Sequence, residues 1–422
     1  MEMDILKIIS KFETGEKEKL LKFERYYKGE HDIKNKKTSS PNKPNHKLTT
    51  NFCKIITNTT AGYFMGTNVT YETQDENLKK EIEKITDFNS DDTVNMNHAL
   101  NLSMFGKSFE IEWLDEDKQY RYKDVSPLEM IPIYDIDIDK TLKKVIRFYD
   151  IENPEDDSTI RHIEVLDDRV IEKYKCDSST LTELEFLGAT EHHFGRCPVI
   201  EIINNKYKMS DFDDVISLQD GYNKHQSLTL DDFDYLADAY LMFEDGDVDM
   251  EEAKEMRDNR IILGKGAFLT KSDNGVASEN FKTRVRDDIF STSATVDLQC
   301  ESMGNTSGEA LIYKFQCMEN RVATTQKMFE DGLNKRFDFI IHILNLKGGS
   351  YENDISYKFT RNIAKNLKEI AEIIDMLRDI LPTETLIRQI PFIKNPEEEY
   401  KKLLKEKPDF VQFNTGIDDD DE

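Results

Sequence analysis

Apolar residues recur at helical spacing in the first part of the chain. Between Ile5 and Tyr27 they stand three or four positions apart and Gly29 follows as a stop signal, so the pattern predicts one helix. The alternation in NVTYET, residues 68–73, predicts a strand. Three further helices are predicted on the same grounds, at residues 51–64, 75–88 and 91–105.

From Ser108 to about Ile203 the period shortens to that of β-strands. The segments include SFEIEWL, YRYKDV, LEMIPIYDIDID, KVIRFYD, RHIEVLD, VIEKYK and CPVIEII. The turns between them are too short for βαβ crossovers, so we expect an antiparallel meander. Trp113, the only tryptophan, falls in the first segment and is expected in the core.

Helical spacing returns at Asp211 and continues to about Phe243. An insert follows, with an acidic turn, a short helix at 251–259 and the segment RIILGKGAFLT. Another helix is expected near Phe281 to Phe290. Near the end of the chain the pattern predicts a strand in YENDISYKFT, helices at 367–380, 384–390 and 396–405, and a disordered acidic run, GIDDDDE.

The longest helical pattern begins directly after the polar, glycine-bearing stretch GNTSG. Thr306 and Glu309 have the spacing of a capping box. One apolar face then follows at steps of three, four or seven, formed by Leu311, Phe315, Met318, Val322, Phe329, Leu333, Ile340 and Leu344. No proline interrupts the run, which predicts a rod on the order of 50 Å long at 1.5 Å per residue. Such a rod suits a spanning element of an assembly, and the glycines before it suit a loop that bends.

The composition of the chain argues against several classes of protein. The 422 residues include 84 acidic and 57 basic ones, a net charge of -27, which argues against wrapping nucleic acid on a basic surface. The five cysteines form no CxxC pair, as expected of reduced thiols rather than disulfides or a zinc site. No apolar run reaches 18 residues, so we expect a protein that is cytosolic where it is made.

Most catalytic motifs fail on spacing. The chain has no GxxxxGK[ST] phosphate loop, and Ser307 stands three residues after Gly304 rather than two, so it does not fit a nucleophile elbow. The acidic stretch from Asp245 has Met250 where a calcium loop requires glycine. We therefore expect no enzyme of these classes.

Two polar clusters leave alternatives open. Asp135, Asp137 and Asp139 would share one side of a strand, where they either hold a divalent ion, as in a metal-dependent nuclease, or form a solvated face, which we favour. His192 and His193 lack a third ligand and are read as turn residues. The basic stretch 34–47 contains no interleaved aromatic residues and is read as an exposed solubilising loop rather than a phosphate-binding segment.

Several stretches together resemble the portal proteins of tailed bacteriophages, in the branch found in long-tailed phages of Gram-positive bacteria. They occur in the order that family shows, between about Tyr26 and Lys405. These stretches are YYKGEHDI, PNHKLTTNFCKIITNTTAGYFMGTNVTYE, SMFGKSFEIEWLDED, HHFGRCPVIEIINNK, SLQDGYNKHQSLTLDDFDYLADAYLMF, NTSGEALIYKF and DISYKFTRNIAKNLKEIAEIIDML.

The resemblance implies an α+β portal fold with a mixed α/β wing, helical stem, small α/β clip, long kinked wing helix and helical C-terminal crown. Carried onto this chain, it assigns 1–209 to the wing, 210–243 to the first stem helix, 244–276 to the clip, 277–290 to the second stem helix, 291–307 to a tunnel loop, 308–360 to the long wing helix and return strand, 361–410 to the crown and 411–422 to an acidic disordered tail.

The resemblance also implies a function without catalysis. Twelve subunits would form a ring at one capsid vertex, through which double-stranded DNA enters and leaves the virion, after assembly in the host cytoplasm. Expected partners are the terminase large subunit, the head-tail adaptor, and a major capsid or scaffolding protein, with no membrane and no cofactor. Divalent cations would assist ring assembly.

Two sets of residues follow from the assignment. The tunnel loop would present Val296, Asp297, Gln299, Glu301, Asn305, Thr306 and Ser307 to DNA, and acidic or neutral groups there would let the duplex slide. The clip would meet its partners through Arg260, Lys265, Phe268 and Lys271. A metal-dependent nuclease using the three aspartates and a cytosolic scaffold protein are the rival interpretations.

Overall fold

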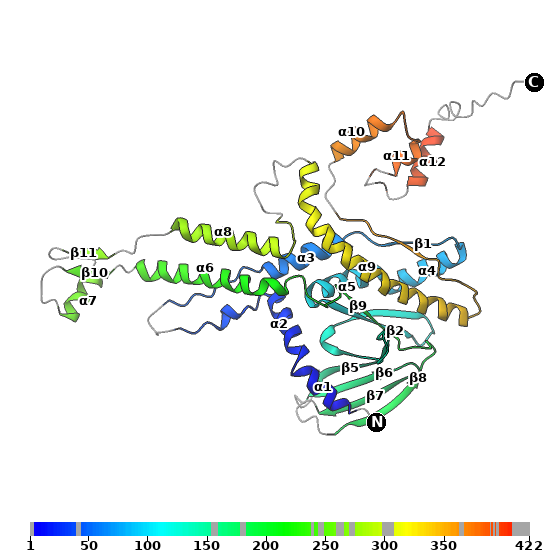
Figure 1. The fold of residues 1–422 in the computed structure, drawn as a ribbon, viewed down its shortest axis with the longest axis horizontal. Helices are drawn as coiled ribbons and strands as arrows, with labels where there is room; N and C mark the ends of the chain where they lie inside the picture. Colours follow the sequence, from blue (N-terminus) through cyan, green and yellow to red (C-terminus); the bar gives the residue numbers. More distant parts are fainter. Residues whose placement is uncertain are drawn as a thin grey trace, which may run out of the picture. The chain divides into compact units, whose positions relative to one another are not determined.

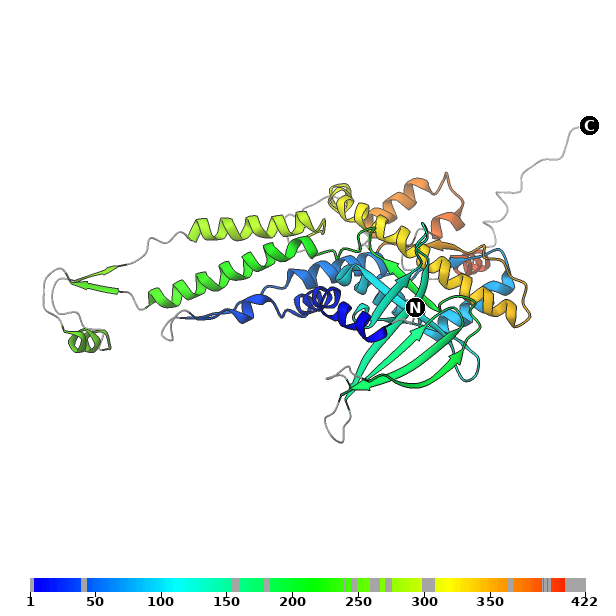
Figure 2. The ribbon, with the colours of Figure 1, turned by 60° about the horizontal axis from the view of Figure 1, so that its bottom comes forward.

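The fold combines helical layers with antiparallel sheets, as predicted (Figures 1 and 2). The computed structural model describes residues 4–38, 44–152, 159–177, 183–237, 240–243, 249–258, 266–269, 275–297, 308–362, 367–388, 390, 393 and 396–406. Two compact units are present, one of residues 1–306 and 310–362 and the other of 307–309 and 363–422, and each is described by itself.

The N-terminal segment forms two helices where one was predicted. Helix α1, Ile5–Glu13, ends at Thr14, whose hydroxyl donates to the carbonyl of Ser10, and α2, Glu16–Lys28, begins after Gly15. Gly29 ends α2 with φ 82°, as expected of a C-terminal glycine. The three predicted helices that follow are confirmed as α3, Phe52–Met65, α4, Glu76–Asn89, and α5, Asp91–Phe105.

The β region divides into two sheets, which corrects the single meander. Five strands form a meander in the order β4-β5-β6-β7-β8, and the last strand, β9, returns to β2 in a separate sheet of order β3-β2-β9. The bounds are β2 Lys107–Leu114, β3 Tyr120–Val125, β4 Met130–Tyr134, β5 Leu142–Glu152, β6 Thr159–Leu166, β7 Val170–Asp177, β8 Glu185–Glu191 and β9 Val199–Ile203. All pairs are antiparallel, and β8 was not predicted.

Helices α1 and α2 cover one face of the five-stranded sheet. Phe12 packs edge-on against Phe148 of β5 with ring centroids 6.0 Å apart, in a core that also contains Ile9, Ile146 and Ile163. Trp113 is half-buried and lies outside this core, because Arg121 and solvent share its environment. Burial of the apolar strand faces is the main force that holds helices and sheet together.

Helices α6, Ile216–Ala237, and α8, Gly275–Thr292, run side by side (Figures 1 and 2). His225 of α6 bonds to the hydroxyl of Ser278 at 2.8 Å. The helix predicted to reach Phe243 ends at Ala237, and Tyr240–Phe243 forms β10, which pairs with β11, Gly266–Leu269. The short helix α7 is Met250–Asp258.

A polar stripe on α6 holds the extended segment before α3. Gln219, Asn223 and Ser227, all fully buried, bond to the backbone of residues 48–52. One turn further on, Asp231 accepts hydrogen bonds from Lys36 and from the backbone of His46. The described part of the basic stretch is therefore tied to α6, while Lys34, Lys37 and Lys47 are exposed, as expected of this stretch.

The long helix is confirmed as α9, Gly308–Leu346, whose 39 residues span about 58 Å at 1.5 Å per residue. Met318, Val322, Phe329, Leu333 and Ile340 of the predicted apolar face are fully buried. At Gly332 the helix approaches β9 so closely that a Cβ would lie 2.7 Å from Cγ1 of Ile202. The return strand β12, Ser356–Lys358, pairs with β1, Thr70–Glu72.

The second unit contains three helices, α10 Leu367–Leu377, α11 Thr383–Ile387 and α12 Pro396–Glu406. They match the three predicted helices to within three residues at each end. Leu386 of α11 is buried within this unit. Among the described residues, none of the helices has the length and apolar character required to cross a bilayer.

Candidate functional site

The predicted DNA-facing loop lies between α8 and α9. Its first part is described as far as Asp297, and α9 begins at Gly308. Gln299, Glu301, Asn305, Thr306 and Ser307 lie outside the described residues, as does the predicted capping hydroxyl of Thr306. We call residues 293–297, which precede the segment, its first base, and the beginning of α9, which follows the segment, its second base. The structure shows the contacts that hold each of these two bases in place.

The first base is closed by backbone hydrogen bonds. The amide of Ser293 donates to Ile289 at 3.0 Å, and the amide of Thr295 donates to Phe290 at 3.1 Å. Between them Ala294 has a φ of 48°, in the left-handed region that terminates helices. For a residue with a Cβ this conformation costs about 1 kcal/mol or more. The surrounding contacts must therefore fix the turn at this position.

Arg321 of α9 supplies those contacts. Its guanidinium donates to the carbonyl of Ser293 and to the hydroxyl of Thr60 on α3, and it lies 3.8 Å from the buried carboxylate of Asp211. Arginine suits such a position because its planar fork of donors reaches several acceptors at once. A single side chain thus joins the loop base, α3 and the segment that leads into α6.

Val296 and Asp297 continue this fixed base. Val296 is 8% exposed, so its side chain packs inside the subunit and a DNA-facing role does not fit it. Asp297 forms an ion pair with Arg286 of α8 at 2.7 Å, and its side chain is 19% exposed. The acid expected to line a channel is therefore engaged by a cation of its own subunit, which reduces its repulsion of phosphates.

The second base lies near the start of α9. Phe315 stacks on Tyr63 of α3 with ring centroids 5.6 Å apart. One turn later Glu319 accepts the hydroxyl of Tyr63 at 2.6 Å and both prongs of Arg361, at 2.8 and 2.9 Å. The hydrogen bonds from Arg361 lower the pKa of Glu319, although partial burial opposes them. Helix α3 thus contacts both bases, which fixes the distance between them.

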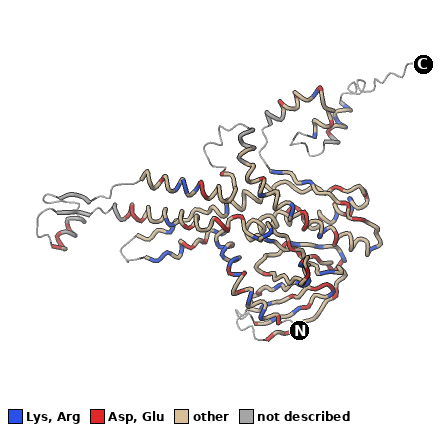
Figure 3. The backbone as a smooth tube through the Cα atoms, in the orientation of Figure 1, with Lys and Arg blue, Asp and Glu red and all other residues tan. Residues whose placement is uncertain are grey.

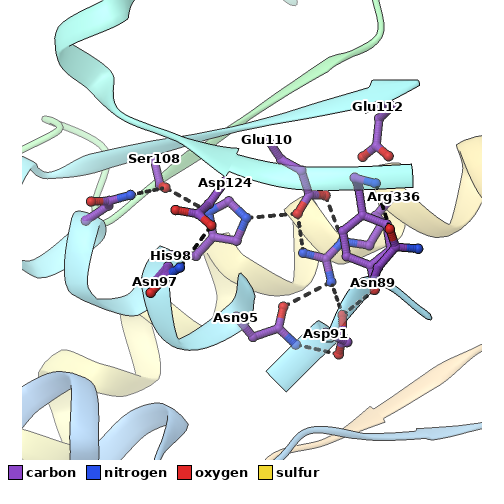
Figure 4. Close-up of polar contacts among 12 residues, drawn as sticks. Asn89, Asp91, Asn95, Asn97, His98, Ser108, Glu110, Glu112, Asp124 and Arg336 are labelled. Carbon is purple, nitrogen blue, oxygen red and sulfur yellow. Dashed lines mark hydrogen bonds and ion pairs between the residues drawn. The ribbon is translucent and has the colours of Figure 1, made fainter. Parts of the chain in front are cut away.

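A buried ionic network anchors the C-terminal half of α9 (Figure 4). Arg336 is 1% exposed and donates to Glu110 of β2 at 2.7 Å and to Asp91 of α5 at 2.8 Å. Its guanidinium also lies over the ring of Tyr122, 4.6 Å from the centroid. His98 bonds to the other side of Glu110 at 2.8 Å. These contacts join α9, α5 and β2 through one cation.

Three acidic groups share this site. Asp91 is satisfied by Arg336 together with the hydroxyls of Tyr71 and Tyr122, at 2.6 and 2.7 Å. Burial alone would raise the pKa of Glu110, but the charge of Arg336 and the bonds from His98 hold it well below its usual range. Burial and the charge of Glu110 raise the pKa of Glu112 well above its usual range. This environment therefore favours the protonated form of Glu112.

The three aspartates of the rival metal site lie in a turn and not along one side of a strand. Strand β4 ends at Tyr134, and Asp135, Asp137 and Asp139 lie in the turn before β5. Asp135 is engaged by Lys143 at 3.3 Å, and Asp137 accepts from Thr141. In the described part of the chain no group of three or more acids, histidines and cysteines is arranged to hold a metal ion. His192 and His193 follow β8 in a turn, as predicted.

Of the four residues predicted to contact partners of the clip, the structure describes only Phe268. Arg260, Lys265 and Lys271 lie outside the described residues, and Phe268 lies in β11, where it pairs with Leu241 of β10.

The anchoring arginines were missed by sequence reasoning, although a signal existed. Arg336 stands three residues after Leu333 and four before Ile340, on the apolar face itself, and Arg321 stands three after Met318. A cation on an apolar stripe is expected to meet a buried acid. Glu110 and Glu112 alternate with apolar residues in the predicted strand SFEIEWL, but α5 and α9 cover the side of the strand on which they lie.

Comparison with known proteins defines the class. The family model described as "Phage portal protein, SPP1 Gp6-like" matches residues 6–411, so the chain belongs to this family of bacteriophage portal proteins. The portal protein of Clostridium phage phiCD119 is 24% identical over 462 residues, covering 99% of both chains. The portal protein of Bacillus phage SPP1 is 24% identical over 436 residues, covering 96% of this chain and 86% of that protein.

The ionic network predicts that the loss of either of two neighbouring cations lowers the free energy of unfolding by very different amounts. Arg336→Met leaves Asp91 and Glu110 buried without a countercharge and should lower the free energy of unfolding by about 3–5 kcal/mol. Lys335→Met removes a half-exposed cation paired with Asp331 and should cost about 1 kcal/mol or less. Urea unfolding of both variants measures the difference, and similar values would contradict the assigned role of Arg336.

Glu112 predicts a pH dependence of stability. Because its folded pKa is raised, its protonated form stabilises the fold fully below the unfolded carboxyl pKa, and that contribution is lost as pH rises through the folded pKa. Glu112→Gln stays neutral, so it should flatten the fall in the free energy of unfolding as pH rises from the unfolded carboxyl pKa to the folded pKa. Glu110→Gln is the matched control on the same strand. It should destabilise the fold at pH 7, because Arg336 loses one of its two ionised partners and keeps only Asp91.

Proposed function

We propose that this chain is one subunit of a closed ring at a single capsid vertex. The ring serves as the channel for double-stranded DNA during genome packaging and ejection. It carries out no reaction and needs no cofactor. The family membership across residues 6–411 supports this proposal. The subunit reaches the virion from the host cytoplasm, where twelve copies assemble.

The observation that carries the proposal is the pair of fixed bases around residues 298–307. Arg321 holds one base and the cluster of Tyr63, Glu319 and Arg361 holds the other. The two fixed ends determine where the ten residues between them begin and end. We assign the DNA-facing role to Gln299, Glu301, Asn305, Thr306 and Ser307, with Asp297 at the margin.

The charge of the chain fits passage rather than retention of DNA. Acidic and basic residues are interspersed along the described backbone (Figure 3), and the whole chain carries -27. Because affinity for DNA grows with each phosphate that a cation neutralises, a surface of this balance binds the duplex weakly. Weak contact is what a channel requires if DNA is to move through it in both directions.

We assign the remaining elements of the chain to the stem, clip, wing and crown, and we assign partners to the clip and the wing. Helices α6 and α8 form the stem, and the β10–β11 pair with α7 forms the clip, which docks the terminase large subunit and later the head-tail adaptor through Arg260, Lys265, Phe268 and Lys271. The wing, within residues 1–209 and 308–360, meets the major capsid or scaffolding protein. Helices α10 to α12 form the crown.

The proposal predicts rings whose formation depends on ions. Copies that each carry -27 repel one another, so we expect assembly to strengthen with added salt or magnesium. Electron microscopy of the purified chain should show annular particles with an axial opening, and sedimentation should show a larger assembled fraction at high ionic strength. A monomer under every condition would contradict the ring. An oligomer that ignores both salt and magnesium would contradict the electrostatic argument alone.

A further inference from the structure

Two buried polar atoms beside the first base have no hydrogen-bond partner among the described residues. They are Oδ2 of Asp211 and Nε of Arg321. The side chain of Asp211 is 3% exposed, and its Oδ2 lies 3.8 Å from a terminal nitrogen of Arg321, which is beyond hydrogen-bond distance. Because a buried carboxylate oxygen without a donor is costly, this pair favours a closer contact than the one it makes.

Asp211 itself is held in place. Its amide donates to the carbonyl of Ser103 on α5 at 2.9 Å, and its other carboxylate oxygen, Oδ1, accepts the side-chain amide of Asn204 at 2.9 Å. Asn204 in turn accepts the hydroxyl of Thr325 on α9 at 2.7 Å. A closer contact must therefore come from movement of the long side chain of Arg321, which has several rotatable bonds.

The hydrogen bonds that Arg321 makes to described residues all go to neutral acceptors. Its guanidinium donates to the carbonyl of Ser293 and to the hydroxyl of Thr60, and it reaches the hydroxyl of Thr295 at 3.4 Å. A carboxylate binds a guanidinium more strongly than a neutral oxygen does. The structure therefore leaves the stronger acceptor, Asp211, unused, and the alternative arrangement requires the movement of one side chain.

The first base depends on where Arg321 points. Ala294 has a φ of 48°, a conformation that a residue with a Cβ keeps only where the surrounding contacts impose it. The carbonyl of Ser293 directly precedes Ala294, and it loses the donor on α9 when Arg321 moves to Asp211. The turn at residues 293–295 then loses the contact that supports its strained residue.

We propose that Arg321 alternates between Ser293 and Asp211, and that Asp211 is the positioning residue that sets the share of each arrangement. With Arg321 on Ser293, the first base is fixed to α9. With Arg321 on Asp211, the first base is released, and α9 is joined instead to the segment that leads into α6. These two arrangements form a two-state element.

The switch is a property of one subunit and does not rest on the proposed ring, because every contact in it lies within one chain. A displacement of α6 relative to α9 changes the distance between Asp211 and Arg321. Such a displacement therefore changes the share of molecules in which the first base is fixed.

Hydrogen exchange of the backbone amides of residues 293–295 tests the switch in the full-length chain. Asp211→Asn keeps an acceptor for Asn204 but removes the charge that competes for Arg321. Exchange at these amides should slow by about fivefold, the effect of one hydrogen bond of ordinary strength. If Asp211 only stabilises the fold, the same substitution speeds exchange or leaves it unchanged, and either result overturns the proposal.

A second variant acts in the opposite direction and carries the test if Asp211→Asn fails to fold. Thr60→Val removes a neutral acceptor, so Arg321 should move to Asp211 more often and exchange at residues 293–295 should speed up by about fivefold. Thr57→Val is the matched control, because Thr57 is buried one turn earlier on the same helix and its hydroxyl has no partner among the described residues. Equal exchange in these two variants overturns the proposal.

The double variant separates a switch from a simple clamp. In the Asp211→Asn background Arg321 has no second charged acceptor, so Thr60→Val should no longer speed exchange. Acceleration that persists in the double variant contradicts the role of Asp211. A chain that forms no ring contradicts the proposed function alone, because the expected exchange rates depend on contacts within one subunit.

Discussion

The buried guanidinium of Arg336 is the interaction on which the rest of the fold depends. It neutralises Glu110 and Asp91 at once, and these acids come from β2 and α5, elements more than two hundred residues earlier in the chain. Taking such groups out of water costs several kcal/mol each, and only complete pairing offsets that cost. The pairing therefore favours one placement of α9 against β2 and α5, whereas apolar contacts alone tolerate many.

The placement of α9 then determines where the proposed DNA-facing segment begins and ends. Arg321, four turns closer to the N-terminus of the same helix, holds the carbonyl of Ser293, and Glu319 joins the helix to Tyr63 and Arg361. A rod fixed in its C-terminal half by Arg336 carries these contacts to a defined position. Rigid support therefore lies on both sides of residues 298–307.

The sequence was informative where a pattern is local. The apolar face of α9 and the helices α3, α4 and α5 follow from spacing alone, because an amphipathic helix needs only its own periodicity to be recognised. The return of β9 to β2 and the burial of Glu110 depend on distant partners, whereas local hydrogen bonds close the break at Thr14 and Gly15. The burial of Val296, which is 8% exposed, is likewise a property of the folded subunit that the local sequence does not show.

Cross-linking within DNA-filled particles tests the central claim most directly. A photoreactive amino acid in place of Asn305, between the two fixed bases, should form covalent adducts with the packaged duplex. The same group in place of Lys84, an exposed residue of α4, should form none. Adducts at 84 with none at 305 would contradict the account, because the segment held by Arg321 and Glu319 would then not face the DNA.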